Sequence, residues 1–188
     1  FGRKQTSAPR VVDLNEAVRR TLLVRRFHHE SQGIRVVADL DTAAPLVWAN
    51  PSEVLQLVLN LVLNAEEAVS RGPAERAITL RTRAQGAVAR LECADTGPGI
   101  DPEALARVFD PFFTAKPGGG GTGLGLSACY GIVRSHGGEI SADSTPERGT
   151  TVTVTLPRDP SPETRSAASR AAPPPVRGTR VLLIEDEA

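Results

Sequence analysis

The stretch that decides the fold is residues 109–127, which read FDPFFTAKPGGGGTGLGLS. Four successive glycines stand at 118–121, after Lys116 and just before an apolar helical pattern. Glycine lets the backbone approach an anion closely, and the N–H groups at a helix N-terminus favour negative charge. Lys116 adds a point charge. We therefore expect a mobile lid that binds a polyphosphate, although the stretch taken alone also fits a merely flexible loop.

Two better-known phosphate motifs do not fit this stretch. In a Walker loop the lysine follows the glycines, whereas Lys116 precedes them. Gly118, Gly120 and Gly123 satisfy the G-x-G-x-x-G dinucleotide pattern. That pattern has to follow a strand directly, and residues 112–117 are poor strand formers. The sequence therefore favours another class of nucleotide site.

The composition narrows the function further. The chain of 188 residues carries 22 basic and 22 acidic residues, and no Lys/Arg run exceeds two, so nucleic acid is not a predicted partner. No apolar stretch approaches the ~18 residues of a membrane span, so we expect no direct membrane contact. Cys93 and Cys129 form no pair or metal motif and are interpreted as small core residues of a reducing compartment.

The strongest helical pattern covers residues 51–69. Its apolar residues recur at helical spacing and predict one buried face: Val54, Leu57, Val58, Leu61, Ala65 and Ala68. Gln56, Asn60, Asn64 and Glu67 lie along one edge of that face. Asn is a poor helix former, so two of them one turn apart indicate polar groups aimed into a pocket. The alternative is a pair of solvated amides. An amide oxygen can ligate Mg²⁺ without adding charge beside phosphates.

Two alternating segments, residues 77–84 and 87–95, predict neighbouring strands. The second delivers Asp95 on its core-facing side, directly before a Thr-Gly-Pro-Gly-Ile turn at 96–100. A buried carboxylate is costly without a partner, and a ligand that donates a hydrogen bond, such as an adenine amino group, explains it. Asp95 as a simple turn initiator is the alternative.

The other patterns predict a helix behind Asp13, further strands, a short helix behind Asp101, a helix after the glycines and a closing hairpin. Their expected ranges are 14–29, 34–40, 45–49, 122–136, 139–144 and 150–156. We expect His136 to be structural, and His28 and His29 to be surface residues at a helix C-terminus. Residues 158–178 are predicted to be a linker. A strand-like run at 180–184 then ends in acidic residues 185–187, a cluster that can hold a divalent cation.

Four segments in order resemble the N, G1, F and G2 boxes of the ATP-binding catalytic domain of sensor histidine kinases, within the GHKL superfamily. They are Asn60 with Asn64, residues 95–99, residues 109–113 and residues 121–125. The resemblance covers residues 11–157 and is most similar to the nitrogen-regulation type, including hybrid kinases. It implies an α/β fold: a two-layer sandwich of the Bergerat type, with a mixed sheet and helices on one face.

The resemblance also implies roles. Asp95 would accept from the adenine amino group, Asn64 would ligate Mg²⁺ with help from Asn60, and Lys116 would hold phosphates beside the backbone of 121–126. Asn60 and Lys116 would be the catalytic residues, because phosphoryl transfer depends on positioning and charge neutralisation. The implied nucleotide contacts are Asn60, Asn64, Glu67, Ala68, Asp95, Gly97, Gly99, Ile100, Lys116, Gly121, Thr122, Gly123, Leu124, Gly125, Leu126 and Thr150.

The implied function is transfer of the ATP γ-phosphate to a histidine on an upstream domain. Residues 1–10 resemble the end of that dimerisation and phosphoacceptor domain, and residues 179–188 resemble the first strand of a receiver domain. The implied partners are ATP, that acceptor domain and a response-regulator receiver. We expect a cytoplasmic, monomeric fragment of a homodimeric protein.

Two other functions stay open at this point. One is an ATPase of the same superfamily, as in gyrase, mismatch-repair or heat-shock chaperone proteins. Those proteins carry Glu where this chain has Asn60, and an amide cannot take a proton from water, so we expect slow hydrolysis. The other is a non-enzymatic module whose lid senses nucleotide.

Overall fold

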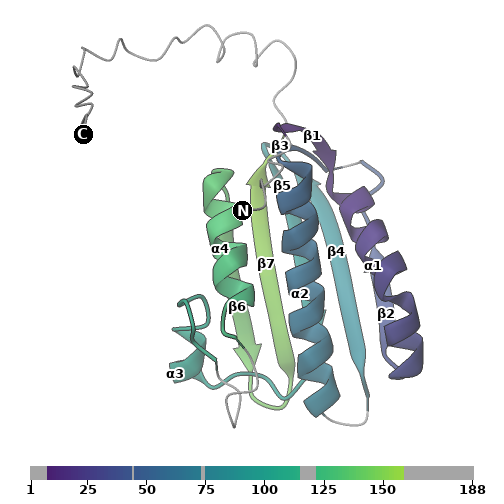
Figure 1. The fold of residues 1–188 in the computed structure, drawn as a ribbon, viewed down its shortest axis with the longest axis vertical. Helices are drawn as coiled ribbons and strands as arrows, with labels where there is room; N and C mark the ends of the chain where they lie inside the picture. The colour runs from purple at the N-terminus through teal and green to yellow at the C-terminus, as the bar shows by residue number, and fades with distance from the viewer. Residues whose placement is uncertain (1–7, 44, 73–74, 115–121, 159–188) are drawn as a thin grey trace, which may run out of the picture.

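The computed structural model describes residues 8–43, 45–72, 75–114 and 122–158. Within these ranges the elements are β1 (Arg10–Asp13), α1 (Leu14–Ser31), β2 (Arg35–Asp39), β3 (Leu46–Ala49), α2 (Pro51–Arg71), β4 (Ala77–Gln85), β5 (Val88–Asp95), α3 (Pro102–Leu105), α4 (Gly125–Ser135), β6 (Glu139–Thr145) and β7 (Gly149–Pro157). Helices α1, α2 and α4 lie on one face of a five-stranded sheet (Figure 1). The predicted two-layer α/β sandwich is confirmed.

The sheet is mixed, with the strand order β2-β4-β5-β7-β6. β2 pairs with β4 in parallel, and the other neighbours are antiparallel. The last residues of β5 therefore lie beside the first residues of β7, with Ala94 opposite Thr151. This register brings Asp95 next to the turn that joins β6 to β7.

The core lies between α2 and the middle of the sheet. The predicted face of α2 is buried, with Leu57 and Val58 fully inaccessible, and Cys93 and Cys129 are buried free thiols as expected. Burial raises the pKa of the Cys129 thiol to about 12, so neither reactivity nor metal binding is favoured at this site. The opposite face of the sheet carries ion pairs, among them Arg81 and Arg83 with Asp39.

The observed elements differ from the predicted ones in two places. The helix expected from residue 122 begins at Gly125, because Gly123 has φ +63, which a right-handed helix does not allow. The carbonyl of Gly123 accepts from the N–H of Phe112 at 3.1 Å, which fixes this turn to the residues before the glycine run. The strand β1 was not predicted; it pairs with β3, so that Arg10 lies opposite Ala49.

His29 is buried between α1 and α2, so its predicted surface position is wrong. Its Nε2 lies 2.6 Å from Oε1 of Glu66, and Arg25 donates to the same carboxylate through Nε and Nη2 at 3.0 and 2.6 Å. Glu66 is 5% exposed. A buried carboxylate needs paired donors, and these come from the end of α1. His28 is half-exposed and 3.6 Å from the same carboxylate.

Several expectations fall outside the described residues. These are the lid with Lys116 and Gly121, the linker and receiver-like strand beyond residue 158, and residues 1–7 of the helix end expected over residues 1–10. Among the described residues, no helix combines the length and the hydropathy needed to cross a membrane.

Candidate nucleotide-binding site

The predicted contacts converge at one end of the helical layer. α2 runs toward this end and α4 runs away from it, while β5 ends there and β7 begins there (Figure 1). The second half of α2, the start of α4 and the carboxyl end of β5 therefore surround the same region. Lys116 and Gly121, which lie outside the described residues, precede the start of α4 in the sequence.

Asp95 is half-buried at the end of β5, and within residues 8–43, 45–72, 75–114 and 122–158 only its Oδ1 accepts hydrogen bonds. Oδ1 accepts from the N–H of Gly97 at 2.8 Å and from the N–H of Thr150 at 3.3 Å. Burial raises the pKa of the Asp95 carboxyl, and these two hydrogen bonds act in the opposite direction. In the part of the chain that the structure describes, Oδ2 has no hydrogen-bond partner, so it suits a ligand that donates.

The glycines around Asp95 allow backbones to pack closely. A Cβ on Gly97 would lie 2.8 Å from the Cβ of Ala68 and 2.8 Å from Oδ1 of Asp95. Gly149 has φ +89, and a Cβ there would lie 1.9 Å from the carbonyl oxygen of Asp95. Gly97 and Gly99 were the glycines predicted to make room for a base. In the structure they bring α2 and the β6–β7 turn against the end of β5.

Ser144, on β6, joins the predicted contacts and was missed by the sequence analysis. Its Oγ accepts from the N–H of Ile100 at 2.9 Å, donates to the carbonyl of Gly149 at 2.9 Å, and lies 3.0 Å from Oγ1 of Thr150. A signal was available, because Ser144 follows Ile140 and Ala142 in the alternation that faces the helices. An inward-facing hydroxyl near a strand end indicates a polar site.

Asn60 and Asn64 face the first residue of α4. Nδ2 of Asn60 donates to the carbonyl of Gly125 at 3.5 Å, and a Cβ on Gly125 would lie 3.2 Å from Nδ2 of Asn64. Nδ2 of Asn64 is buried and has no hydrogen-bond partner among the described residues. A buried N–H donor without a partner costs about 1–3 kcal/mol, so this group suits a ligand that accepts a hydrogen bond, such as a phosphate oxygen. Two neutral amides fit the ligands expected for Mg²⁺ beside phosphate.

The N-terminus of α4 supplies backbone donors to the same place. The bond from Ala128 N to Leu124 O, at 2.9 Å, starts the helical series, so the preceding N–H groups have no intrahelical acceptor. Such groups and the helix dipole bind anions. The Leu126 side chain packs against the core and the Leu124 side chain is exposed. A ligand at this helix N-terminus would therefore contact the backbone of these two residues and not their side chains. Thr122 is exposed at the edge of this site.

Two further predicted contacts, Glu67 and Ala68, lie near the end of α2. Ala68 packs against Gly97, so that a Cβ on that glycine would lie 2.8 Å from the Cβ of Ala68. Glu67 is half-buried, and its backbone carbonyl accepts from Ser70 Oγ at 2.8 Å.

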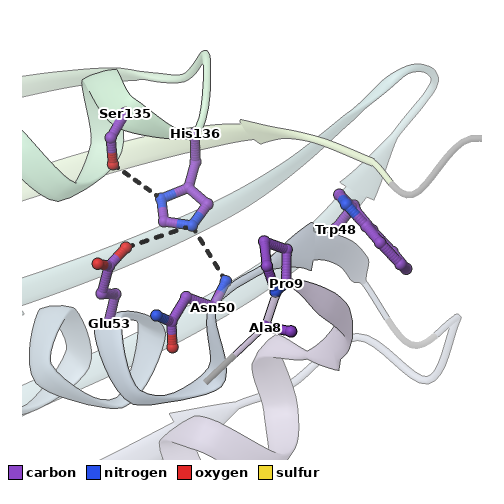
Figure 2. A pocket seen from close by; sticks show the side chains of 7 residues that line it. All are labelled: Ala8, Pro9, Trp48, Asn50, Glu53, Ser135 and His136. Carbon is purple, nitrogen blue, oxygen red and sulfur yellow. Dashed lines mark hydrogen bonds and ion pairs between the residues drawn. The ribbon is translucent and has the colours of Figure 1, made fainter. Parts of the chain in front are cut away.

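A pocket of about 530 Å³ opens at the other end of the helical layer (Figure 2). It is lined by Ala8, Pro9, Trp48, Asn50, Glu53, Ser135 and His136. None of the predicted contacts belongs to it. Figure 2 shows His136 held between Ser135, Glu53 and the N–H of Asn50, in agreement with a structural role.

Comparison with known proteins agrees with this geometry. Residues 49–160 match the family described as histidine kinase-, DNA gyrase B- and HSP90-like ATPases. The chain is 36% identical to the sensor kinase CckA of Brucella abortus, covering 100% of this chain and 22% of that protein. It is 38% identical to the sensory histidine kinase/phosphatase NtrB of Rhizobium leguminosarum, covering 76% of this chain and 40% of that protein. The chain thus spans less than half of these curated relatives.

Solved structures give the same result. The nucleotide-free catalytic domain of the histidine kinase ThkA superposes with a TM-score of 0.72 at 28% identity, covering 82% of this chain and 100% of that one. ThkA has also been solved in complex with the response regulator protein TrrA, with a TM-score of 0.68, 26% identity and coverage of 82% and 43%. The chain therefore belongs to the family of histidine kinase-, DNA gyrase B- and HSP90-like ATPases, as an ATP-binding catalytic domain of the sensor histidine kinase type.

Proposed function

We propose that the chain binds ATP with Mg²⁺ and transfers the γ-phosphate to a histidine on a separate upstream domain. The observation that carries this proposal is the pair of side-chain amides of Asn60 and Asn64, which lie on α2 and face the first residue of α4. Asn64 has a buried, unpaired Nδ2, and both amides lie beside a helix N-terminus. This arrangement suits phosphates and a divalent cation, and it contains no base for water.

The residues of the chain would act mainly by positioning. Asp95 would accept from the adenine amino group through Oδ2, and the backbone at 121–126 would donate to phosphate oxygens together with Lys116. Asn64 and Asn60 would hold Mg²⁺, which would neutralise charge on the phosphates. Phosphoryl transfer needs little covalent help, so a site of this kind is sufficient once an acceptor histidine is placed in line.

The ATPase alternative is disfavoured by the residue at position 60. An amide cannot accept the proton of an attacking water, so hydrolysis should be slow. Two of the described histidines are poor phosphoacceptors, since His29 is buried against Glu66 and His136 is bonded through both ring nitrogens. The third, His28, lies in the last turn of α1, 3.6 Å from the same Glu66 carboxylate and away from the candidate site. The acceptor then belongs to another domain, with a response-regulator receiver as the next partner, in a homodimeric cytoplasmic kinase.

Incubation with γ-labelled ATP tests the proposal. The chain alone should acquire no acid-labile label, whereas the helical acceptor domain of the parent protein, added as a second chain, should become labelled on histidine. The acceptor domain without this chain is the control. Stoichiometric acid-labile label on this chain alone would contradict the proposal, and rapid phosphate release would favour the ATPase.

A further inference from the structure

Three polar groups meet at the hydroxyl of Ser144, and their chemistry fixes its hydrogen bonds. The N–H of Ile100 can only donate, and the carbonyl of Gly149 can only accept. Ser144 has a single hydroxyl proton. If that proton goes to Gly149, as the 2.9 Å distance allows, Ser144 can only accept from Thr150 Oγ1 at 3.0 Å. This is the assignment that satisfies all three contacts at once.

The assignment has a consequence for Thr150. Its hydroxyl proton points to Ser144, so toward other groups Oγ1 offers lone pairs and no donor. Thr150 also donates its backbone N–H to Oδ1 of Asp95 at 3.3 Å and is 8% exposed. The half-buried Asp95 carboxylate and the buried Thr150 Oγ1 therefore form a neighbouring pair of acceptors at the junction of β5 and β7.

We propose that Ser144 is a positioning residue that sets base specificity, by holding the Thr150 hydroxyl as an acceptor beside Asp95. The site then matches a purine with an amino group at position 6 and opposes one with a carbonyl there. Without Ser144 the Thr150 hydroxyl turns freely and donates to such a carbonyl. This inference rests on the proposed binding of an adenine nucleotide at Asp95.

Calorimetry with ADP and with inosine diphosphate on the 188-residue chain tests the inference. The readout is the ratio of the two affinities. Ser144→Ala should lower the preference for ADP about fivefold, the value of one neutral hydrogen bond. Ser144→Thr keeps a hydroxyl and should retain the preference. Ser141→Ala is the matched control, since Ser141 lies on the same strand but is exposed, opposite Thr153.

The outcomes separate this inference from the proposed function. A parallel loss of both affinities in Ser144→Ala, with an unchanged ratio, would show a merely structural role and overturn the inference. If Ser144→Ala does not fold, Thr150→Val with Ser144 intact replaces it. An unchanged ratio of ADP to inosine diphosphate affinity in that variant would also overturn the inference. In the folded double variant, Ser144→Ala should add nothing to Thr150→Val. If the unsubstituted chain fails to bind ADP, the proposed function falls first and the inference with it.

Discussion

Two asparagines, Asn50 at the N-cap of α2 and Asn64 within the helix, differ in whether their side-chain amides have a hydrogen-bond partner within the described ranges. Asn50 caps the start of the helix, where its side-chain Oδ1 accepts from Ser52 N at 3.0 Å and its backbone N–H donates to His136 Nε2 at 3.1 Å. Asn64, further along, leaves a buried Nδ2 without a partner among the described residues. The paired amide holds secondary structure, whereas the unpaired one suits a ligand. The difference lies in pairing rather than in residue type or burial.

Glu66 is the strictest test of this comparison, because it lies near the site end of α2 but is fully paired. Glu66→Ala should cost about 3–5 kcal/mol of unfolding free energy, since it leaves His29 and Arg25 without their buried carboxylate. Glu16→Ala is the control: Glu16 pairs with Arg20 at 2.7 Å on the exposed side of α1 and should cost less than about 1 kcal/mol. Equal losses in urea denaturation would contradict the argument.

Asn64→Ala should show the reverse pattern, with lost activity and kept stability. Labelling of a supplied acceptor domain should fall about a hundredfold, because an expected ligand of Mg²⁺ is removed and such ligands are worth several kcal/mol. The melting temperature should not fall, because no hydrogen bond of Nδ2 is lost. Gln56→Ala, on the exposed side of the same helix, should change neither quantity. A destabilised Asn64→Ala with full activity would reverse our interpretation.

Asp95→Asn should weaken ADP binding about tenfold or more, because the new amide can place a donor against the adenine amino group. Calorimetry on the folded variant measures this effect. Asp143→Asn provides the control, since Asp143 is exposed on β6. Unchanged ADP affinity in Asp95→Asn would remove the adenine assignment.

The raised pKa of Asp95 adds a pH dependence to the same test. In the absence of ligand, the carboxyl takes up a proton at a higher pH than an ordinary Asp. ADP affinity should therefore fall as the pH drops through that raised pKa. The contribution of Asp95 to folding stability should instead rise as the pH falls from the raised folded pKa toward the lower unfolded pKa. In that window the folded state binds more protons than the unfolded state. The Asn variant should lack both trends, as titration calorimetry and denaturation at several pH values would show.

Asn50→Ala should have the smallest effect, about 1 kcal/mol of unfolding free energy, the typical worth of an N-cap. ADP affinity should be unchanged, since the cap lies at the end opposite the site (Figure 1). Asn50→Asp keeps a capping oxygen and should retain the stability. A loss of ADP binding in Asn50→Ala would show that the two ends of α2 do not act separately.

The sequence predicted what depends on local pattern. The stripe of α2, the alternation of β5 and the closing hairpin each follow from a repeat within one segment. His29 was misplaced because its burial depends on Glu66, which is 37 residues away. β1 was missed because four residues give little periodicity, and its partner β3 is distant in the chain.

The candidate site divides in the same way. Asp95 could be predicted because it is a polar residue in an apolar register, and the two asparagines because they lie along the edge of an apolar helical stripe. Ser144 was overlooked because its contacts with Ile100 and Thr150 come from two other segments. The positive φ of a particular glycine is likewise not predictable from the sequence. Gly123 adopts φ +63, and this turn makes α4 begin later than the sequence pattern predicts.

The close approach of Gly149 to Asp95 bears on how a genetic screen of this domain should be interpreted. Substitution of Gly149 will eliminate function in such a screen even if no nucleotide atom touches it, because any side chain would collide with the carbonyl of Asp95. Gly86 has a similar φ of +56 but open space around its Cβ position, so variants there should survive with only backbone strain. A glycine that tolerates no substitution therefore indicates close backbone packing and not a ligand contact. To map the ligand contacts, side-chain variants should be used whose folding has been measured.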